Sequence, residues 1–167
     1  MDEPLIKSIK IEKHSSKNQS EFDAKTATER VMSTELYGVL ATQNNGHPYT
    51  SLVAYANSSD LKHIIFTTPK TTRKHAFLES CHHVAFQVDN RPKEIKSLMV
   101  IESLTATGSA HEINPKEKDY QKFKGLLLDR HHYLEHFLAS PSSALYCINV
   151  NHFFHVVRFQ EVSVVSP

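Results

Sequence analysis

The sequence predicts a mainly β protein, an antiparallel barrel of about seven strands with helices at its periphery. Two observations favour this class. Most apolar residues between positions 38 and 162 fall into short runs or alternating segments separated by turn-forming residues, and helical periodicity is confined to a few stretches. A barrel is the economical arrangement because closing an antiparallel sheet on itself removes exposed strand edges. The 167 residues suit one domain with its own core.

The beginning of the chain differs from the rest. Residues 1–22 are polar and weakly periodic, so we expect an N-terminal arm there and a single domain over residues 23–167. The first element of the domain is expected to be a helix over residues 23–36, because Ala24, Ala27 and Val31 recur on one apolar face.

From Gly38 onward the pattern is that of strands. The segment QNNG at residues 43–46 is a strong hairpin signal, because Asn-Gly accepts positive φ at both turn positions. Between the fifth and sixth strands, a helical stretch over residues 116–138 is expected to be capped by Asn114–Pro115 and broken near Asp129. The expected strands cover residues 38–42, 47–56, 61–68, 84–90, 103–113, 144–150 and 152–162.

Charge and cysteine content exclude several classes of function. A formal net charge of +1 provides no global basic field, so nucleic acid and anionic membranes are not expected partners. No run approaches the roughly 18 apolar residues of a membrane span, and the start MDEPLIKSIKIEK has no signal-peptide core. Cys81 and Cys147 lie far apart without a CxxC motif, which is typical of reduced thiols. We therefore expect a cytoplasmic protein.

The stretch FTTPKTTRKHAFL at residues 66–78 points to an anion site. Thr71 and Thr72 are suitable caps for a short helix, yet Arg73 and Lys74 then occupy its first turn, where the helix dipole makes each cation unfavourable by roughly 0.3–1 kcal/mol. A phosphate held by the free N–H groups, the threonine hydroxyls and both cations would remove that conflict. The four glycines cannot form GxGxxG or GxxxxGK, which excludes a Rossmann site and a P-loop.

Read together, these segments resemble the flavin-binding split barrel of the pyridoxamine 5′-phosphate oxidase superfamily. The resemblance rests on GVLAT, the hairpin turn, GHPYTSLVAYA, IIFTT and TTRKHAFL, and it covers residues from about 23 to 113 best. It implies an antiparallel split barrel that binds FMN. In the family, the Ser/Thr-Arg-Lys turn binds the FMN phosphate, and the strand after Gly-x-Pro runs along the isoalloxazine ring.

The resemblance assigns the cofactor-binding residues. Those that match the flavin-lining strand are Ser51, Leu52, Val53 and Ala54. Thr67 and Thr68 match ribityl and phosphate contacts, and the phosphate grip itself matches Thr72, Arg73 and Lys74. Asn90, in the turn after the fourth strand, resembles polar residues that subfamilies place near the pyrimidine edge.

The departures from the family pattern concern the substrate. Ser51 and Ala56 stand where pyridoxamine phosphate oxidases have Arg and Lys, and the chain has no Trp, so oxidation of vitamin B6 is not expected. The resemblance implies a flavin-dependent oxidoreductase acting on a small molecule, in which the flavin supplies the redox chemistry. No residue is assigned as catalytic, because none presents itself as a general base or nucleophile.

Other functions stay open at this point. A related split-barrel branch binds and degrades haem, and haem ligation by a histidine is the main rival to FMN. A deazaflavin F420 would ask for a similar phosphate grip, and a non-catalytic flavin carrier would share the same residues. His132 and His136 are four apart on a helical stretch, but no third ligand is evident, so no metal site is predicted.

The resemblance also implies a homodimer with the flavin at the subunit interface. A small barrel holds a ring in a groove rather than in a sealed interior, so the ring needs cover from a second chain. We expect Val39, Leu52, Val84 and Phe86 in the barrel core. Arg158 is expected either at the partner's flavin or on the surface, and the second is favoured.

Overall fold

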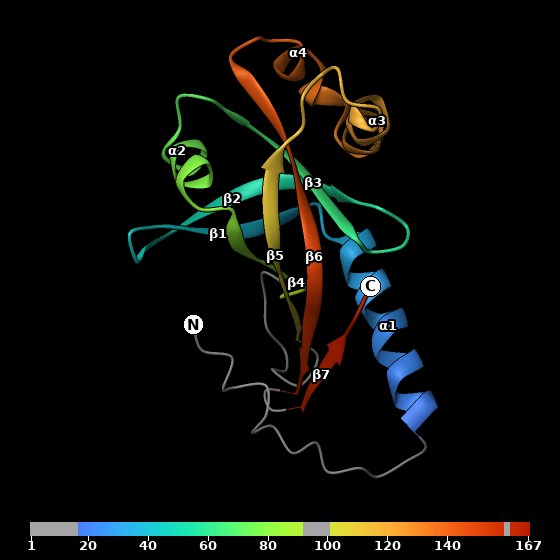
Figure 1. Cartoon of the computed structure of the whole chain (residues 1–167). Coiled ribbons are helices and arrows are strands. Elements are labelled where there is room, and N and C mark those ends of the chain that lie inside the picture. The colour runs from blue at the N-terminus through green and yellow to red at the C-terminus, as the bar shows by residue number, and fades with distance from the viewer. Residues whose placement is uncertain (1–16, 92–100, 159–160) are drawn as a thin grey trace.

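A computed structural model describes residues 17–91, 101–158 and 161–167. Its seven strands form one antiparallel sheet in the order β3-β2-β1-β4-β5-β6-β7, and β3 also pairs with β6. That second pairing closes the first six strands into a barrel, and β7 extends the sheet along β6 (Figure 1). The predicted fold class is confirmed.

The first five strands begin and end within about two residues of the bounds that the sequence predicts. Their bounds are β1 Tyr37–Asn44, β2 His47–Asn57, β3 His63–Pro69, β4 His83–Asp89, β5 Glu102–Glu112, β6 Ser143–Val157 and β7 Glu161–Val165. The helices are α1 Lys17–Thr34, α2 Arg73–Ser80, α3 Tyr120–Arg130 and α4 Glu135–Leu138, with a 3₁₀ turn, η2, at His132–Leu134. No helix in the described part of the chain is long and apolar enough to cross a membrane.

Two local predictions are confirmed in detail. Asn45 and Gly46 turn the β1–β2 hairpin with φ values of 49° and 80°, as a tight Asn-Gly turn requires. Thr72 is the N-cap of α2, and its side chain accepts a hydrogen bond from the His75 backbone N–H. Both features depend on a few adjacent residues, so the sequence pattern identifies them directly.

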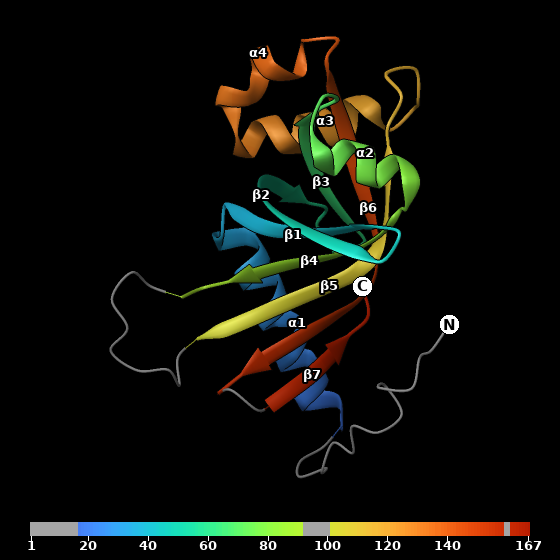
Figure 2. The same cartoon turned by 90° about the vertical axis from the view of Figure 1, so that its left-hand side faces the viewer.

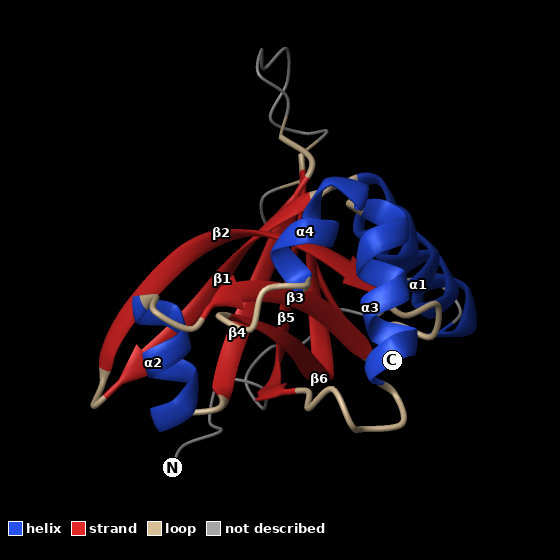
Figure 3. Cartoon of the chain, turned by 90° about the horizontal axis from the view of Figure 1, so that it is seen from above, coloured by secondary structure: helices blue, strands red, loops and turns tan. Residues whose placement is uncertain are grey.

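The core lies inside the barrel. The inward side chains of the strands meet there with Val31 and Met32 from α1 and Leu78 from α2. A second apolar cluster lies outside the barrel, where Phe123 and Leu127 of α3 cover the outward faces of β2, β3 and β6. Figure 3 shows α2 on one side of the barrel and α3 with α4 on the other. Strands β2 and β3 therefore lie between α2 and α3 and contact both helices.

The expected bounds of several helices and strands need correction. The first helix begins at Lys17 rather than at residue 23, so the expected arm to residue 22 includes its first turn, and residues 1–16 lie outside the described part. Asn114–Pro115 does not cap a helix, because residues 115–119 form turns and α3 begins at Tyr120. The expected strands 144–150 and 152–162 are one strand, β6, followed by the separate β7.

The core assignment was right for two residues and wrong for two. Val84 and Phe86 are buried in the barrel. Leu52 is 69% exposed, and Val39, its partner across β1 and β2, is half-buried, because both lie on the outward face. Alternation requires that Val53 and Leu40 point inward instead, and both are buried.

Candidate functional site

A pocket of about 170 Å³ lies outside the barrel, between α2 and the η2–α4 segment. Its lining residues come from five elements of the chain and are Leu52, Val53, Ala54, Thr67, Lys74, Leu134 and Phe137. Strands β2 and β3 supply one side, Lys74 reaches in from α2, and Leu134 and Phe137 form the wall opposite. The pocket thus brings together Leu52, Val53, Ala54, Thr67 and Lys74, which the sequence assigned to a single site.

The start of α2 carries the hydroxyl groups of the predicted phosphate grip. Thr72 Oγ1 donates to the Pro69 carbonyl oxygen at 2.9 Å, and the Thr68 and Thr72 hydroxyl oxygens are 3.0 Å apart. The Thr72 oxygen also accepts from the His75 N–H at 3.4 Å. These bonds hold the first turn of α2 against the end of β3, so the position of its backbone N–H groups is set by the β3–α2 junction.

The two cations of the grip lie in different surroundings. Arg73 is exposed, and its guanidinium carbon lies 5.2 Å from the centre of the Tyr49 ring. Lys74 is half-buried in the pocket, and this burial lowers the pKa of its ammonium group. Neither side chain makes an ion pair with a carboxylate in the described residues, and the first turn of α2 has no acidic residue. Two positive charges therefore lie at a helix N-terminus with no described protein counter-charge.

Three predicted residues contribute less directly. Ser51 lies on the inward face of β2, where its hydroxyl is buried and has no partner among the described residues. The Thr67 hydroxyl donates to the Ala144 carbonyl oxygen at 2.9 Å, so its proton is already used. Asn90 lies beyond the end of β4, where its side-chain oxygen accepts from the Glu102 N–H at 2.8 Å. The structure does not bring Asn90 into the pocket.

Other residues at the site were missed by sequence reasoning. Leu134 and Phe137 form a wall of the pocket although they follow Thr67 by more than sixty positions in the sequence. Beside them, Tyr133 contacts Tyr37 of β1, and both rings are exposed. A helical stretch with apolar residues predicts that one face is covered, but it does not indicate against which strand the segment docks.

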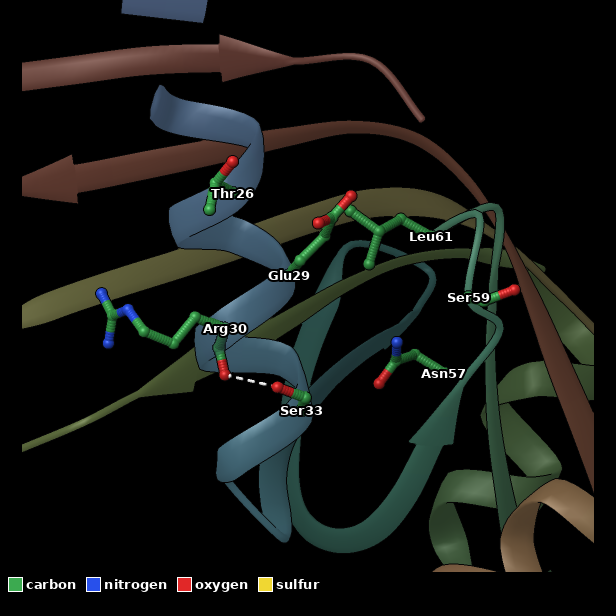
Figure 4. A pocket seen from close by; sticks show the side chains of 7 residues that line it. All are labelled: Thr26, Glu29, Arg30, Ser33, Asn57, Ser59 and Leu61. Atoms are coloured by element: carbon green, nitrogen blue, oxygen red, sulfur yellow. Dashed lines mark hydrogen bonds between the residues drawn. The ribbon is translucent and has the colours of Figure 1, made fainter. Parts of the chain in front are cut away.

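A larger groove, of about 360 Å³, lies elsewhere, between α1 and the loop after β2 (Figure 4). Three of its polar side chains have protein partners: Arg30 pairs with Glu102 at 2.6 Å, and the Asn57 side-chain oxygen accepts from Arg130 at 3.2 Å. The Ser33 hydroxyl donates to the Arg30 carbonyl at 2.9 Å, as the dashed line in Figure 4 marks. Size alone favours this groove, but the two cations at the N-terminus of α2, which could bind an anion, lie at or beside the smaller pocket, and this pocket is the candidate site.

A metal site would require at least three ligand side chains close together. In the described ranges no group of three or more His, Cys, Asp or Glu side chains is arranged to hold a metal ion. His132 and His136 are both exposed, on η2 and α4 respectively. Cys147 is buried, whereas Cys81 is partly exposed and accepts a hydrogen bond from the Gln43 side chain.

Comparison with known proteins gives one family and many structures of similar fold. The family model described as pyridoxamine 5′-phosphate oxidase matches residues 24–156. No curated protein matches the sequence. A heme binding protein from Mycobacterium smegmatis superposes with a TM-score of 0.74 at 14% identity, over 86% of this chain and 57% of that one. This chain thus spans little more than half of that protein.

Two further structures match over most of both chains. HutZ, the heme storage protein of Vibrio cholerae, has a TM-score of 0.69 at 14% identity and covers 81% of this chain and 94% of its own. A FAD-binding protein from Mesorhizobium loti has a TM-score of 0.64 at 16% identity and covers 78% and 90%. At such identities the likeness concerns the fold alone.

Proposed function

The chain belongs to the pyridoxamine 5′-phosphate oxidase family, and from this premise we propose that it is an FMN-binding flavoprotein and a flavin-dependent oxidoreductase acting on a small molecule. Arg73 and Lys74 would hold the phosphate at the start of α2, beside Thr72, whose hydroxyl proton is donated to Pro69. Leu52, Val53 and Ala54 of β2 would line the isoalloxazine ring, which supplies the redox chemistry when bound. The protein's own part is to bind the phosphate, orient the ring and exclude water.

One observation carries the proposal. Arg73 and Lys74 lie in the first turn of α2 without a carboxylate partner in the described chain, and Lys74 is half-buried in the pocket. Burying part of a cation at the positive end of a helix is unfavourable unless an anion accompanies it. A phosphate beside Thr72 would accept hydrogen bonds from free backbone N–H groups and from both cations.

The residues present suit FMN in shape as well as in charge. Leu52, Ala54 and Phe137 offer apolar surface to a flat ring, and Lys74 lines the same pocket. The pocket of about 170 Å³ is smaller than the roughly 300–1,000 Å³ of typical ligand cavities, so one chain provides only part of the enclosure. A small pocket that encloses only part of the ligand is consistent with a site that a second chain completes.

The proposed assembly is a homodimer formed through the outward face of β1 and β2. Large apolar side chains are exposed on and beside this face: Leu36, Tyr37 and Leu52. No helix among the described segments covers β1, β4 and β5 on the side that faces the viewer in Figure 2. A partner packed there would cover Leu52 and the exposed face of the flavin. Arg158 pairs with Glu161 at 3.2 Å, which supports its interpretation as a surface charge.

Haem binding is the second candidate. Two proteins of similar fold are named for haem binding and haem storage. His136 is exposed and adjoins Phe137 in the pocket wall, so it could offer an imidazole to an iron ion there. Haem offers Arg73 and Lys74 only its propionate carboxylates, whereas the Thr72-Arg73-Lys74 segment resembles the phosphate grip of the family, and this resemblance favours FMN.

The absorption spectrum of the purified protein tests the proposal. Flavin bands, with FMN identified by mass spectrometry after heat release, are the expected result, whereas a Soret band would establish haem and overturn it. Mass spectrometry also separates FMN from a deazaflavin. Stopped-flow mixing with NADH or NADPH then tests for catalysis: an oxidoreductase shows saturable flavin reduction, and a carrier does not.

A further inference from the structure

A hydrogen-bond chain runs from the rim of the pocket to a buried histidine. The hydroxyl oxygens of Tyr37 and Tyr133 are 3.1 Å apart, and Tyr133 Oη lies 3.0 Å from His131 Nδ1. His131 Nε2 lies 2.9 Å from the Tyr55 carbonyl oxygen. His131 is only 1% exposed, whereas Tyr37 and Tyr133 are about half exposed, at 49% and 55%. The chain therefore connects a fixed interior acceptor to the surface.

The outer end of this chain adjoins the candidate site. Tyr37 pairs across β1 and β2 with Ala54, and Tyr133 directly precedes Leu134; both Ala54 and Leu134 line the pocket. Thr67 lies on β3, the strand on the other side of β2. Neighbouring strands are about 4.8 Å apart, so Tyr37 lies roughly 10 Å across the sheet from Thr67. Tyr37 is thus at the side of the pocket away from β3.

The chemistry of the inner end sets the direction of every proton. A backbone carbonyl can only accept, so His131 Nε2 carries a proton and donates it to Tyr55. Burial lowers the pKa of His131 from its ordinary value near 6.5, with the charge of the neighbouring Arg130 acting the same way, and this favours the neutral ring at pH 7 and above. Its Nδ1 is then a bare acceptor, and the Tyr133 hydroxyl must donate to it.

The direction of the hydrogen bond between Tyr37 and Tyr133 is fixed in the same way. Tyr133 has a single hydroxyl proton, which is engaged by His131, so in the Tyr37–Tyr133 bond the proton comes from Tyr37. The oxygen of Tyr37 is left with free lone pairs and no free proton. A tyrosine hydroxyl can normally donate or accept a hydrogen bond. The Tyr37 hydroxyl, whose proton is donated to Tyr133, can only accept one at the rim of the pocket.

We propose that Tyr37 is a specificity-determining residue that accepts a hydrogen bond from the imide N–H of the flavin pyrimidine ring, with Tyr133 and His131 as the positioning residues that keep its oxygen an acceptor. The inference rests on the proposed flavin site. The phosphate grip at α2 would fix one end of the cofactor, and the Tyr37 oxygen would accept from the pyrimidine ring at the other end. A ligand without a donor at that position leaves the Tyr37 oxygen unpaired.

The test compares FMN with FMN methylated at the imide nitrogen, by fluorescence titration of apoprotein. Methylation should weaken binding to wild type about three- to tenfold more than it weakens binding to Tyr37→Phe, as expected for one neutral hydrogen bond. Tyr133→Phe frees the Tyr37 hydroxyl to rotate, so its discrimination should fall between the two. Tyr120→Phe, a tyrosine on α3 outside the pocket, should behave as wild type.

The outcomes separate the two proposals. If wild type binds FMN and Tyr37→Phe shows the same methylation ratio, the role of Tyr37 is overturned and the flavin site stands. If wild type does not bind FMN at all, both are overturned. An independent measurement needs no ligand: nitrogen NMR of the histidine rings should show His131 as the Nε2–H tautomer, and the Nδ1–H tautomer would contradict the proton order.

Discussion

The hydroxyl of Tyr55 and the guanidinium of Arg130 donate to the same backbone oxygen, that of Met32, at 3.0 and 2.8 Å. The Arg130 guanidinium carbon also lies 4.8 Å from the centre of the Tyr55 ring. Arg130 donates further to the carbonyls of Ser33 and Glu35. One side chain of α3 thereby satisfies carbonyls at the end of α1 that no helical N–H can reach, and it joins both helices to strand β2.

The first prediction follows from this junction. Arg130→Met should lower the free energy of unfolding by about 2–4 kcal/mol, because several charge-assisted hydrogen bonds to partly buried carbonyls are lost together. Chemical denaturation measures the change. Arg158→Met, which removes an exposed ion pair to Glu161, should cost at most about 1 kcal/mol. Equal losses in the two variants would show that the Arg130 contacts have no special weight.

The second prediction concerns the phosphate grip. The double variant Arg73→Ala/Lys74→Ala should bind FMN roughly two to four orders of magnitude more weakly, since two charge-assisted hydrogen bonds of about 1.5–3 kcal/mol are lost. Lys74→Ala alone should cost more than Arg73→Ala, because Lys74 lines the pocket whereas Arg73 lies exposed over Tyr49. Calorimetric titration measures these affinities.

Riboflavin is the matched control for the grip, because it lacks the phosphate. It should bind wild type and the double variant about equally weakly. The apoprotein of the double variant should be as stable as wild type or slightly more so, since both cations oppose the helix dipole. A double variant that keeps FMN and loses thermal stability would show that the basic pair is structural.

The third prediction concerns assembly. Leu52→Lys should turn the proposed dimer into a monomer and weaken flavin binding, because it places a charge in the middle of the apolar outward face. The fold should survive, since Leu52 is 69% exposed in the single chain. Analytical ultracentrifugation measures the mass in solution. A wild-type monomer that holds flavin tightly would rule the dimer out.

The fourth prediction concerns pH and His131. This ring is surrounded by Arg130, the Tyr133 and Tyr37 rings and the Tyr55 carbonyl, and its pKa is lowered from its ordinary value. In the unfolded chain the same histidine titrates near 6.5. As pH falls through that value the unfolded state binds a proton that the folded state binds less readily, so the free energy of unfolding falls.

Replacement of His131 removes this contribution. His131→Gln should be less stable than wild type at neutral pH, but its stability should decline less between about pH 7.5 and 5.5. Denaturation curves across that range provide the comparison. His132→Gln, at the exposed neighbouring position, serves as the control and should keep the wild-type slope. A slope unchanged in His131→Gln would mean that this histidine is not held neutral by the fold.

The sequence by itself determined the features that depend on neighbouring residues. The turn at Asn45 and Gly46 and the cap at Thr72 each follow from the conformational preference of one or two side chains, and both are confirmed. The barrel class followed from alternation repeated along the chain. The clustering of charge at Arg73 and Lys74 was likewise visible without any coordinates, because these residues are adjacent.

Tertiary structure alone decided which face of each strand is covered and which distant segments meet. Alternation divides β2 into two faces, but only pairing and closure place Val53 inside and Leu52 outside, since a strand satisfies its own pattern in either orientation. Leu134, Phe137 and the Tyr37–Tyr133–His131 chain reach the pocket through the docking of η2 and α4 beside β2. Such contacts depend on the burial of whole faces rather than on local preference, and no short stretch of sequence encodes them.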